Sequence, residues 1–323
     1  MSDTPAVSVV IPLYDKGPYI ARALNSVLSQ TVQSFEVIVV DDGSTDNGAE
    51  VVKGFVDPRI KLIRQENQGV SAARNRGISE ATTDFIAFLD ADDEWLPKHL
   101  ETLLMLREKY PRAGAYGTAY LMKMKNLRIK AAPFSSEIPK EPWEGILPSY
   151  FKAAALGEPP ISASTVAIPK FVLKEMGGFK TEAWWAEDND LWGRIALKYP
   201  IAFSWDGGGI YHLEASDRAG NRIEAVEENI FITSSRQAIQ AGKVPPELKK
   251  DLLEYLALKQ IQTAGLNLKA GRPELARSNL RNCKTQYLWK LKYWTLFWTY
   301  VPSRIFIKLR NFKSGAMKIV GWD

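Results

Sequence analysis

Cysteine and histidine are scarce in this sequence. Cys283 is the single cysteine among 323 residues, which excludes a disulfide framework and favours a reducing compartment. The two histidines, His99 and His212, are too few for a histidine-rich metal centre. No apolar run reaches the roughly 18 residues that a bilayer-spanning helix requires. The first residues lack the basic and apolar pattern of a signal peptide, so we expect a cytoplasmic location.

The composition is otherwise that of an ordinary globular protein. Apolar residues make up 46% and charged residues 24%, which excludes a disordered or collagen-like chain. The length suits one large domain or two modest ones. From Arg281 onward there are nine basic residues and one acidic residue, whereas the first 280 residues carry a net charge of −3. We therefore expect a basic interaction surface in the C-terminal tail.

The first ninety residues alternate between apolar runs and helical periodicity. The expected strands cover 7–11, 35–40, 60–64 and 84–89, and the expected helices cover 19–31, 49–55 and 71–80. Strands that alternate with helices in this way predict a parallel, doubly wound sheet with right-handed crossovers.

The rest of the chain is less regular. We expect a helix from about Trp95, strands at 115–124 and 161–168, and helices at 170–176 and 187–199. The segment 133–160 is expected to be a long loop with short helices. After about residue 224 the pattern is helical, and the segments 248–268 and 273–282 are expected to form a helical hairpin.

A cluster of carboxylates follows the apolar run 85–89. Asp90, Asp92 and Asp93 repel one another unless a hard cation or several donors lie among them. Ligands of α/β proteins bind at the carboxyl edge of the sheet, where these side chains are expected. The cluster therefore indicates a divalent metal that holds phosphates; a solvated acidic turn is the alternative.

Four segments of the first hundred residues resemble, in their order, the inverting family 2 glycosyltransferases of the GT-A fold. They are VVIPLYDK (9–16), VVDDGSTD (39–46), NQGVSAARN (67–75) and FLDADD (88–93). The resemblance continues through residues 177–179, 187–192 and 211–212 and leaves the tail outside it. It implies an α/β protein with a GT-A-type, doubly wound, mostly parallel sheet and a helical C-terminal extension. The expected parts are a domain at 1–223, with a nucleotide-binding half (1–110) and an acceptor half (111–223), and a basic, aromatic region at 224–323.

The resemblance also implies an activity. The expected enzyme is a metal-dependent, inverting glycosyltransferase that takes its sugar from a nucleoside-diphosphate sugar. The resemblance to the family favours a UDP-sugar as the donor. The acceptor would be a hydroxyl of a glycan or a lipid-linked molecule in polysaccharide or cell-envelope synthesis.

The donor site implied by the family pattern lies in the first half of the chain. Contacts to the nucleotide are expected from Pro12, Tyr14, Asp42, Arg74 and Asp90, and Mn2+ or Mg2+ is expected on Asp92 with His212 approaching from the second half. A tyrosine ring can stack on a base, and a carboxylate can accept from a base N–H. Local packing of the tyrosine, turn chemistry at Asp-Gly-Ser, a surface ion pair of the arginine and a structural histidine are the alternatives.

Acidic residues in the second half are candidates for the catalytic base. Inversion by a single displacement needs a carboxylate opposite the leaving group, which takes the proton of the acceptor hydroxyl. Asp188 is the expected base, with Glu187 supporting it or binding the acceptor, and Asp190 is the alternative base. Acids in a first helical turn also stabilise the helix dipole, which is the non-catalytic interpretation. The ring pair Trp184-Trp185 is expected to form a shelf for a sugar, and core packing of at least one of the two rings is the alternative.

The tail mixes aromatic and basic residues over 287–300 and stays basic to Lys318. Such a composition favours the interface of an anionic bilayer, so we expect peripheral attachment to the inner face of the cell membrane. A buried helix and a homodimer contact are the alternatives. No recognition motif supports nucleic-acid binding.

Two rival functions remain at this point. A magnesium-dependent phosphatase of the haloacid-dehalogenase type also uses Asp-x-Asp after a strand, but it would want the motif on the first strand and Thr or Val at the position of Glu94. A catalytically degenerate transferase that serves as a membrane scaffold is the non-enzymatic alternative.

Overall fold

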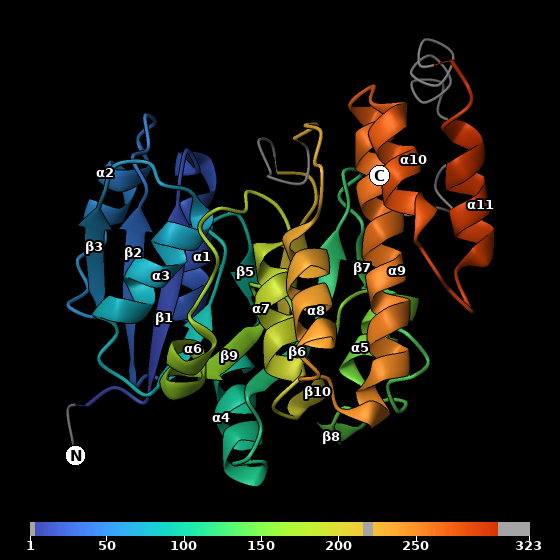
Figure 1. Ribbon diagram of the computed structural model, residues 1–323. Helices are drawn as coiled ribbons and strands as arrows, with labels where there is room; N and C mark the ends of the chain where they lie inside the picture. The colour runs from blue at the N-terminus through green and yellow to red at the C-terminus, as the bar shows by residue number, and fades with distance from the viewer. Residues whose placement is uncertain (1–3, 216–221, 303–323) are drawn as a thin grey trace. The chain divides into compact units, whose positions relative to one another are not determined.

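The structure is a computed structural model that describes residues 4–215 and 222–302. The chain divides into two compact units, residues 1–216 and 217–323 (Figure 1). The first unit contains every residue that the sequence assigns to the donor site and the catalytic acids.

The first unit is built on a ten-stranded mixed sheet with the strand order β3-β2-β1-β4-β9-β6-β10-β5, in which β7 pairs with β6 and β8 with β10. The strands are β1 (Val7–Leu13), β2 (Phe35–Asp41), β3 (Ile60–Arg64), β4 (Phe85–Phe88), β5 (Glu94–Trp95), β6 (Ala115–Lys123), β7 (Ile129–Ala131), β8 (Glu144–Ile146), β9 (Val166–Pro169) and β10 (Ile201–His212). Strands β3, β2, β1 and β4 run parallel, as expected for a doubly wound half. The predicted α/β fold is confirmed.

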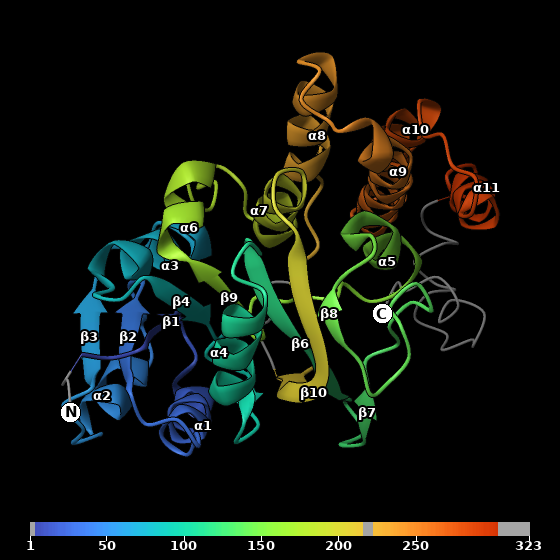
Figure 2. The same cartoon turned by 90° about the horizontal axis from the view of Figure 1, so that it is seen from below.

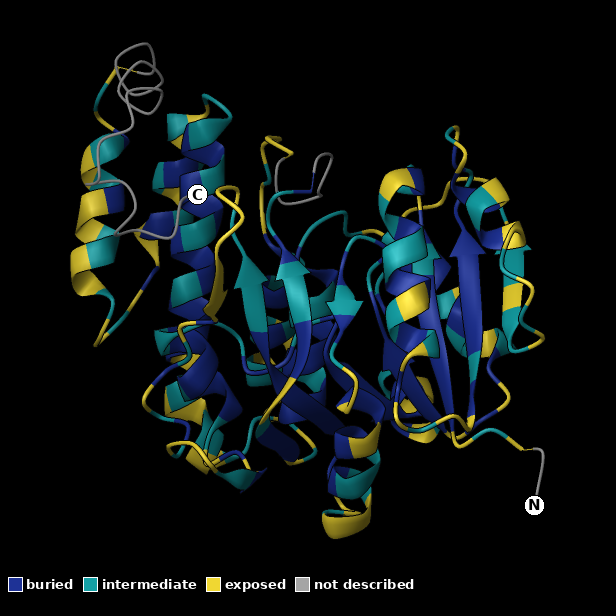
Figure 3. Cartoon of the chain, turned by 180° about the vertical axis from the view of Figure 1, so that it is seen from behind, coloured by how far each residue is buried: buried dark blue, intermediate teal, exposed yellow. Residues whose placement is uncertain are grey.

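Helices cover both faces of this sheet, as Figure 2 shows. One face carries α1 (Gly17–Leu28), α2 (Gly48–Lys53) and α4 (His99–Lys109), and the other carries α3 (Val70–Glu80), α6 (Lys170–Met176) and α7 (Glu187–Ala196). Helix α5 (Tyr150–Leu156) belongs to the second half of the unit. The central strands are buried on both sides (Figure 3), which explains why they read as continuous apolar runs.

The two faces of β1 show how the layers pack. Val9 and Ile11 belong to the apolar core shared with α1 and α4, whereas Val10 points to α3 on the opposite face. A Cβ on Gly77 of α3 would lie 2.3 Å from Val10 Cγ1, so this helix approaches the sheet closely only because residue 77 is glycine.

The second half of the unit differs from the expected pattern in two places. The predicted strand 161–168 is a strand only from Val166 to Pro169, and β9 runs antiparallel to both of its neighbours, β4 and β6. The predicted helix start near Trp95 is wrong, because Glu94 and Trp95 pair with β10 and α4 begins at His99. Both differences arise from long-range strand pairing, which local periodicity does not reveal.

The C-terminal unit is helical. It contains α8 (Ile230–Gln240), α9 (Pro246–Lys269), α10 (Pro273–Arg281) and α11 (Trp289–Trp298). The predicted hairpin is confirmed as α9 and α10, joined through Gly271 in a left-handed conformation. Among the described residues, no helix combines the length and apolar character needed to cross a membrane. The basic stretch from Arg304 to Lys318 lies outside the described residues.

Candidate active site

The carboxyl ends of three parallel strands carry the residues that the sequence assigns to the nucleotide. Tyr14 follows β1, Asp42 follows β2, and Asp90 lies just beyond the end of β4. Because these strands are neighbours and parallel, their ends meet at one edge of the sheet. Pro12 precedes this edge within β1, opposite Val40 of β2.

Asp42 organises the loop that leads into α3. Its carboxylate accepts hydrogen bonds from Gln65 Nε2 at 2.7 Å, from the Gln68 amide at 3.0 Å and from the Gly69 amide at 2.8 Å. The side chain is buried, whereas Tyr14 on the neighbouring loop is 46% exposed. Tyr14 therefore offers an accessible ring beside a rigid carboxylate.

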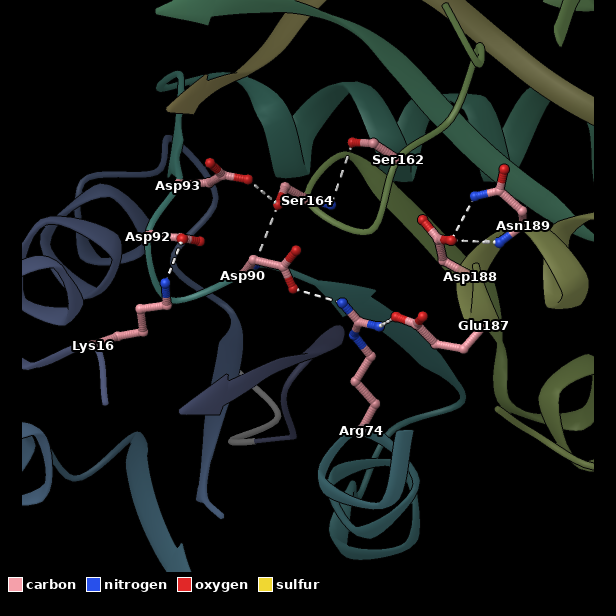
Figure 4. A network of polar contacts seen from close by, with 10 residues as sticks. All are labelled: Lys16, Arg74, Asp90, Asp92, Asp93, Ser162, Ser164, Glu187, Asp188 and Asn189. Atoms are coloured by element: carbon pink, nitrogen blue, oxygen red, sulfur yellow. Dashed lines mark hydrogen bonds and ion pairs between the residues drawn. The ribbon is translucent and has the colours of Figure 1, made fainter. Parts of the chain in front are cut away.

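Arg74 of α3 joins the first half of the unit to the second. Its Nη2 donates to Asp90 Oδ1 at 2.8 Å, and its Nη1 donates to Glu187 Oε1 at 2.8 Å (Figure 4). The guanidinium also lies 5.1 Å from the ring centroid of Phe179. Burial opposes the charged form, but the two carboxylates outweigh it and raise the pKa of Arg74 above its usual value.

Glu187 is the first residue of α7 and is almost completely buried. Burial raises the pKa of its carboxyl to about 7, and the charge of Asp188 adds to this shift while Arg74 opposes it. The carboxyl is therefore poised to change protonation near neutral pH.

Asp188 is half-buried and lies beside this pair. Its Oδ1 accepts from the amide of Asn189 at 2.6 Å and from Asn189 Nδ2 at 2.5 Å, which fixes the direction of the carboxylate. In Figure 4, Glu187 and Asp188 come from α7 on one side, and Asp90 and Asp92 from the segment after β4 on the other.

Asp190 is held differently. Its side chain is fully buried, and its Oδ2 accepts from Arg194 Nε at 2.8 Å within α7. Arg194 in turn donates to the carbonyls of Met176 and Gly178 at the end of α6. Asp190 therefore ties α6 to α7, and its burial and ion pair argue against the alternative role as base.

The acidic residues after β4 each have a separate partner. Asp92 Oδ2 lies 3.0 Å from Lys16 Nζ, and Arg22 donates to the Asp92 carbonyl. Asp93 is buried and accepts from Ser164 Oγ at 2.5 Å and from the His212 amide at 2.9 Å. Burial, together with the charges of Asp92 and Asp90, raises the pKa of the Asp93 carboxyl well above its usual value.

The position of Lys16 depends on the conformation of Asp15, the residue before it. Asp15 has a left-handed backbone with φ of 48°, and its carboxylate accepts from the Thr45 amide at 2.7 Å. The Gly17 amide donates to Asp46 Oδ2 at 2.7 Å on the other side. The β1–α1 loop is therefore anchored to the loop after β2, and the lysine it carries meets Asp92.

His212 does not meet Asp92 in this arrangement. The imidazole is fully buried, with Nδ1 2.6 Å from Glu214 Oε1 and Nε2 2.9 Å from Glu94 Oε1. Because both ring nitrogens are hydrogen-bonded, the ring would have to release a carboxylate before it could bind a cation. Its backbone amide, in contrast, orients Asp93.

The residues at the sheet edge can supply few metal ligands. In the part of the chain that the structure describes, no group of three or more His, Cys, Asp or Glu side chains is arranged to hold an ion. Asp92 offers a hard oxygen donor at the rim, which suits an octahedral cation that takes its remaining ligands from phosphates and water. The residues therefore fit a cation that arrives with a phosphorylated ligand.

Sequence reasoning found the acids but missed some of their partners. Lys16 belongs to the segment VVIPLYDK, yet its pairing with Asp92 spans 76 positions of the chain and has no local signal. Ser164, which also accepts from the Asp90 amide at 3.2 Å, lies in a segment expected to be strand. The rings of Trp184 and Trp185 are half-buried, with centroids 6.4 Å apart.

Comparison with known proteins identifies the fold and the family of this arrangement. The profile of "Glycosyl transferase family 2" matches residues 8–175, which is more than half of the chain. The chain is 44% identical over 108 residues to the uncharacterized glycosyltransferase YibD of Escherichia coli K12, and the alignment covers 33% of this chain and 31% of that protein. The chain thus spans about a third of the length of the curated relatives it matches.

Solved structures share the fold. The complex of an S. aureus TarS fragment with UDP-GlcNAc aligns with a TM-score of 0.63 at 20% identity and covers 91% of this chain and 89% of that one. Mannosyltransferase PcManGT from Pyrobaculum calidifontis, solved with GDP-Man and Mn2+, aligns with a TM-score of 0.58 at 21% identity and covers 96% of this chain and 85% of that one.

Proposed function

The chain belongs to glycosyl transferase family 2, and from this premise we propose that it moves a sugar from a nucleoside-diphosphate sugar to an acceptor hydroxyl with inversion at the anomeric carbon. One observation supports this more than any other. Arg74 links Asp90, at the edge where a nucleotide would bind, to Glu187, which precedes the candidate base. The two halves of such a reaction would thus share one ion-pair network.

Asp188 is the proposed base. Its carboxylate would take the proton of the acceptor hydroxyl while the acceptor oxygen forms a bond to the anomeric carbon and the bond to the diphosphate oxygen breaks. The two hydrogen bonds from Asn189 support this role, because they orient one carboxylate oxygen. Glu187 would act as a positioning residue that keeps Arg74 beside Asp188.

Charge on the departing diphosphate must be neutralised. Asp92 would hold a Mn2+ or Mg2+ ion, which when bound supplies positive charge to the nucleoside diphosphate as a Lewis acid. The complex of the PcManGT neighbour with GDP-Man and Mn2+ supports this assignment. For His212 we propose a supporting role, in which its backbone fixes Asp93 and its ring holds Glu94.

The donor nucleotide is proposed to lie against the first three loops of the sheet edge. The exposed ring of Tyr14 would stack on the base, and Asp42 and Pro12 would frame it. UDP is the proposed nucleotide, supported by the UDP-GlcNAc complex of the TarS neighbour.

The acceptor is proposed to be a hydroxyl of a glycan or of a lipid-linked molecule in cell-envelope polysaccharide synthesis. The half-buried pair Trp184 and Trp185, directly before α7, would offer an apolar shelf to a sugar ring next to Asp188. A lipid-linked acceptor would place the enzyme at the inner face of the cell membrane.

Metal-dependent hydrolysis of nucleotide sugars is the test of this function. Release of UDP from UDP-GlcNAc or related donors with Mn2+, and its loss in Asp188→Asn, is the expected result. A degenerate scaffold would release no UDP from any donor. Calorimetry on the same samples separates failure to bind from failure to react.

A further inference from the structure

Helix α11 packs on α9 and α10 through a mostly apolar side. Thr295 is fully buried, and Leu291, Leu296 and Trp298 are partly buried against the apolar cluster of α9 and α10. A helix on the surface of a globular unit normally turns its apolar side inward and its polar side to water. The opposite side of α11 should then be polar, but it carries exposed aromatic residues.

Four aromatic residues form one stripe along that side. Trp289, Tyr293 and Phe297 follow one another at spacings of four residues, which places them on one face of α11, and Tyr300 lies two residues beyond the end of the helix. Their exposed fractions are 51%, 58%, 56% and 71%, and Figure 3 colours this side of α11 as largely exposed. We call these four residues the α11 stripe.

The α11 stripe is part of a concentration of exposed rings. Among the described residues, eight aromatic side chains are strongly exposed, and six of these lie between Tyr287 and Tyr300. Scattered single rings on a surface need no explanation, but a contiguous patch of this kind marks an interaction site.

The basic residues around the α11 stripe indicate which kind of partner it binds. Residues 281–300 contain four basic residues and no acidic residue. Lys290 Nζ lies 5.5 Å from the ring centroid of Trp289, and Lys292 Nζ lies 5.5 Å from that of Tyr293. A second copy would bring like charges together, whereas an anionic lipid surface complements them.

The length of α11 sets its orientation. Ten residues span about 15 Å, half of the roughly 30 Å of a bilayer core, so the helix cannot cross it. Aromatic rings flanked by lysines suit the depth of the headgroups, with the helix axis in the plane of the surface.

We propose that the α11 stripe, with Lys284 and Lys290, is a docking surface for an anionic lipid bilayer. The rings enter the headgroup region and the ammonium groups remain at the level of the phosphates. This contact would tether the chain to a membrane, where a lipid-linked acceptor of the proposed function would lie, but it is independent of the transfer chemistry.

Vesicle binding by the full chain tests the proposal. The probes are vesicles of phosphatidylcholine alone and of phosphatidylcholine with phosphatidylglycerol, separated from free protein by sedimentation. We expect binding to the anionic vesicles that weakens with added salt. The triple variant Trp289→Ser, Tyr293→Ser, Phe297→Ser should bind more weakly by roughly tenfold for each ring lost. Phe171→Ser with Leu253→Ser, at exposed positions elsewhere, is the matched control and should bind like the wild type.

A second variant isolates the charge. Lys284→Ala with Lys290→Ala should weaken binding by about fivefold for each lysine, whereas Lys249→Ala with Lys250→Ala on α9 removes the same charge and should change little. All substituted side chains are exposed, so thermal unfolding should be unchanged and donor binding retained.

Equal vesicle binding by the triple variant and the wild type would overturn the proposal. So would self-association of the lipid-free chain that the triple variant abolishes, because the stripe would then belong to a second copy.

Discussion

Arg74 Nη1 and Glu187 Oε1 lie 2.8 Å apart although 113 residues separate them in the chain. Both side chains are nearly buried, and the same guanidinium holds Asp90. An ion pair of this kind makes the position of α7 depend on α3 and on the end of β4. The network can therefore be tested through stability as well as through activity.

Removing the cation from this network should destabilise the first unit. Arg74→Met leaves the buried Glu187 and the neighbouring Asp90 unpaired, at an expected cost of about 3–5 kcal/mol in the free energy of unfolding. Arg76→Met on the same helix removes an exposed pair with Glu80 and should cost less than about 1 kcal/mol. Urea unfolding measures both. The double variant Arg74→Met, Glu187→Gln should recover part of the loss, and no recovery would contradict the pairing.

Stability should also depend on pH through Glu187. Its pKa of about 7 in the folded protein exceeds the usual value of 4.5, so the folded state binds the proton more tightly than the unfolded chain does. Stability should therefore fall as the pH rises from about 4.5 to 7, by roughly 2–3 kcal/mol from this group. Glu187→Gln should lack this part of the pH dependence. Parallel unfolding curves of the two proteins across this range would contradict the assignment.

The base assignment predicts a separation of binding from turnover. Asp188→Asn should lower kcat by about 10²–10⁴-fold while the Kd of the donor stays within about threefold. Asp190→Asn should instead weaken the contact with Arg194 and lower the Tm. Rates corrected for the folded fraction would distinguish them. If folded Asp190→Asn lost turnover while Asp188→Asn kept normal activity, Asp190 rather than Asp188 would be the base.

The pair of Lys16 and Asp92 predicts competition with a cation. Asp92→Asn should abolish metal-dependent donor binding. Lys16→Met should strengthen Mn2+ binding in the presence of UDP by roughly fivefold, because an ion pair worth about 1 kcal/mol no longer competes for the carboxylate. Lys53→Met, at an exposed position of α2, should leave Mn2+ binding unchanged. Titration calorimetry gives the three affinities, and equal values for Lys16→Met and the wild type would exclude the competition.

Much of the fold follows from patterns that are local in the sequence. Strands β1, β2 and β4 are apolar runs because both faces of the sheet are covered, and α6 ends where Gly177 adopts φ of 74°. The acids at the strand ends could be found in the same way. Asp42 and Asp90 each lie within two residues of the end of a strand, and the parallel arrangement of these strands brings both to one edge of the sheet.

Long-range pairing explains what could not be predicted. Glu94 and Trp95 form a strand only because β10 returns beside them, and residues 162–165 leave the expected strand to place Ser164 between Asp90 and Asp93. The pairs Lys16–Asp92 and Arg74–Glu187 also join residues that are far apart in the chain, so neither could be predicted. No periodicity in a single sequence specifies which distant charge will neutralise a given acid.

The antiparallel strand β9 has a consequence for how this chain could change. It is fastened on both edges, by β4 through Phe85 to Ala87 and by β6 through Tyr116 and Gly117. The long stretch 133–160 that precedes it is therefore attached to a fixed point next to the carboxylates. Because β8 and α5 lie within this stretch and are packed against the rest of the unit, insertions would be tolerated best at the exposed residues 140–142.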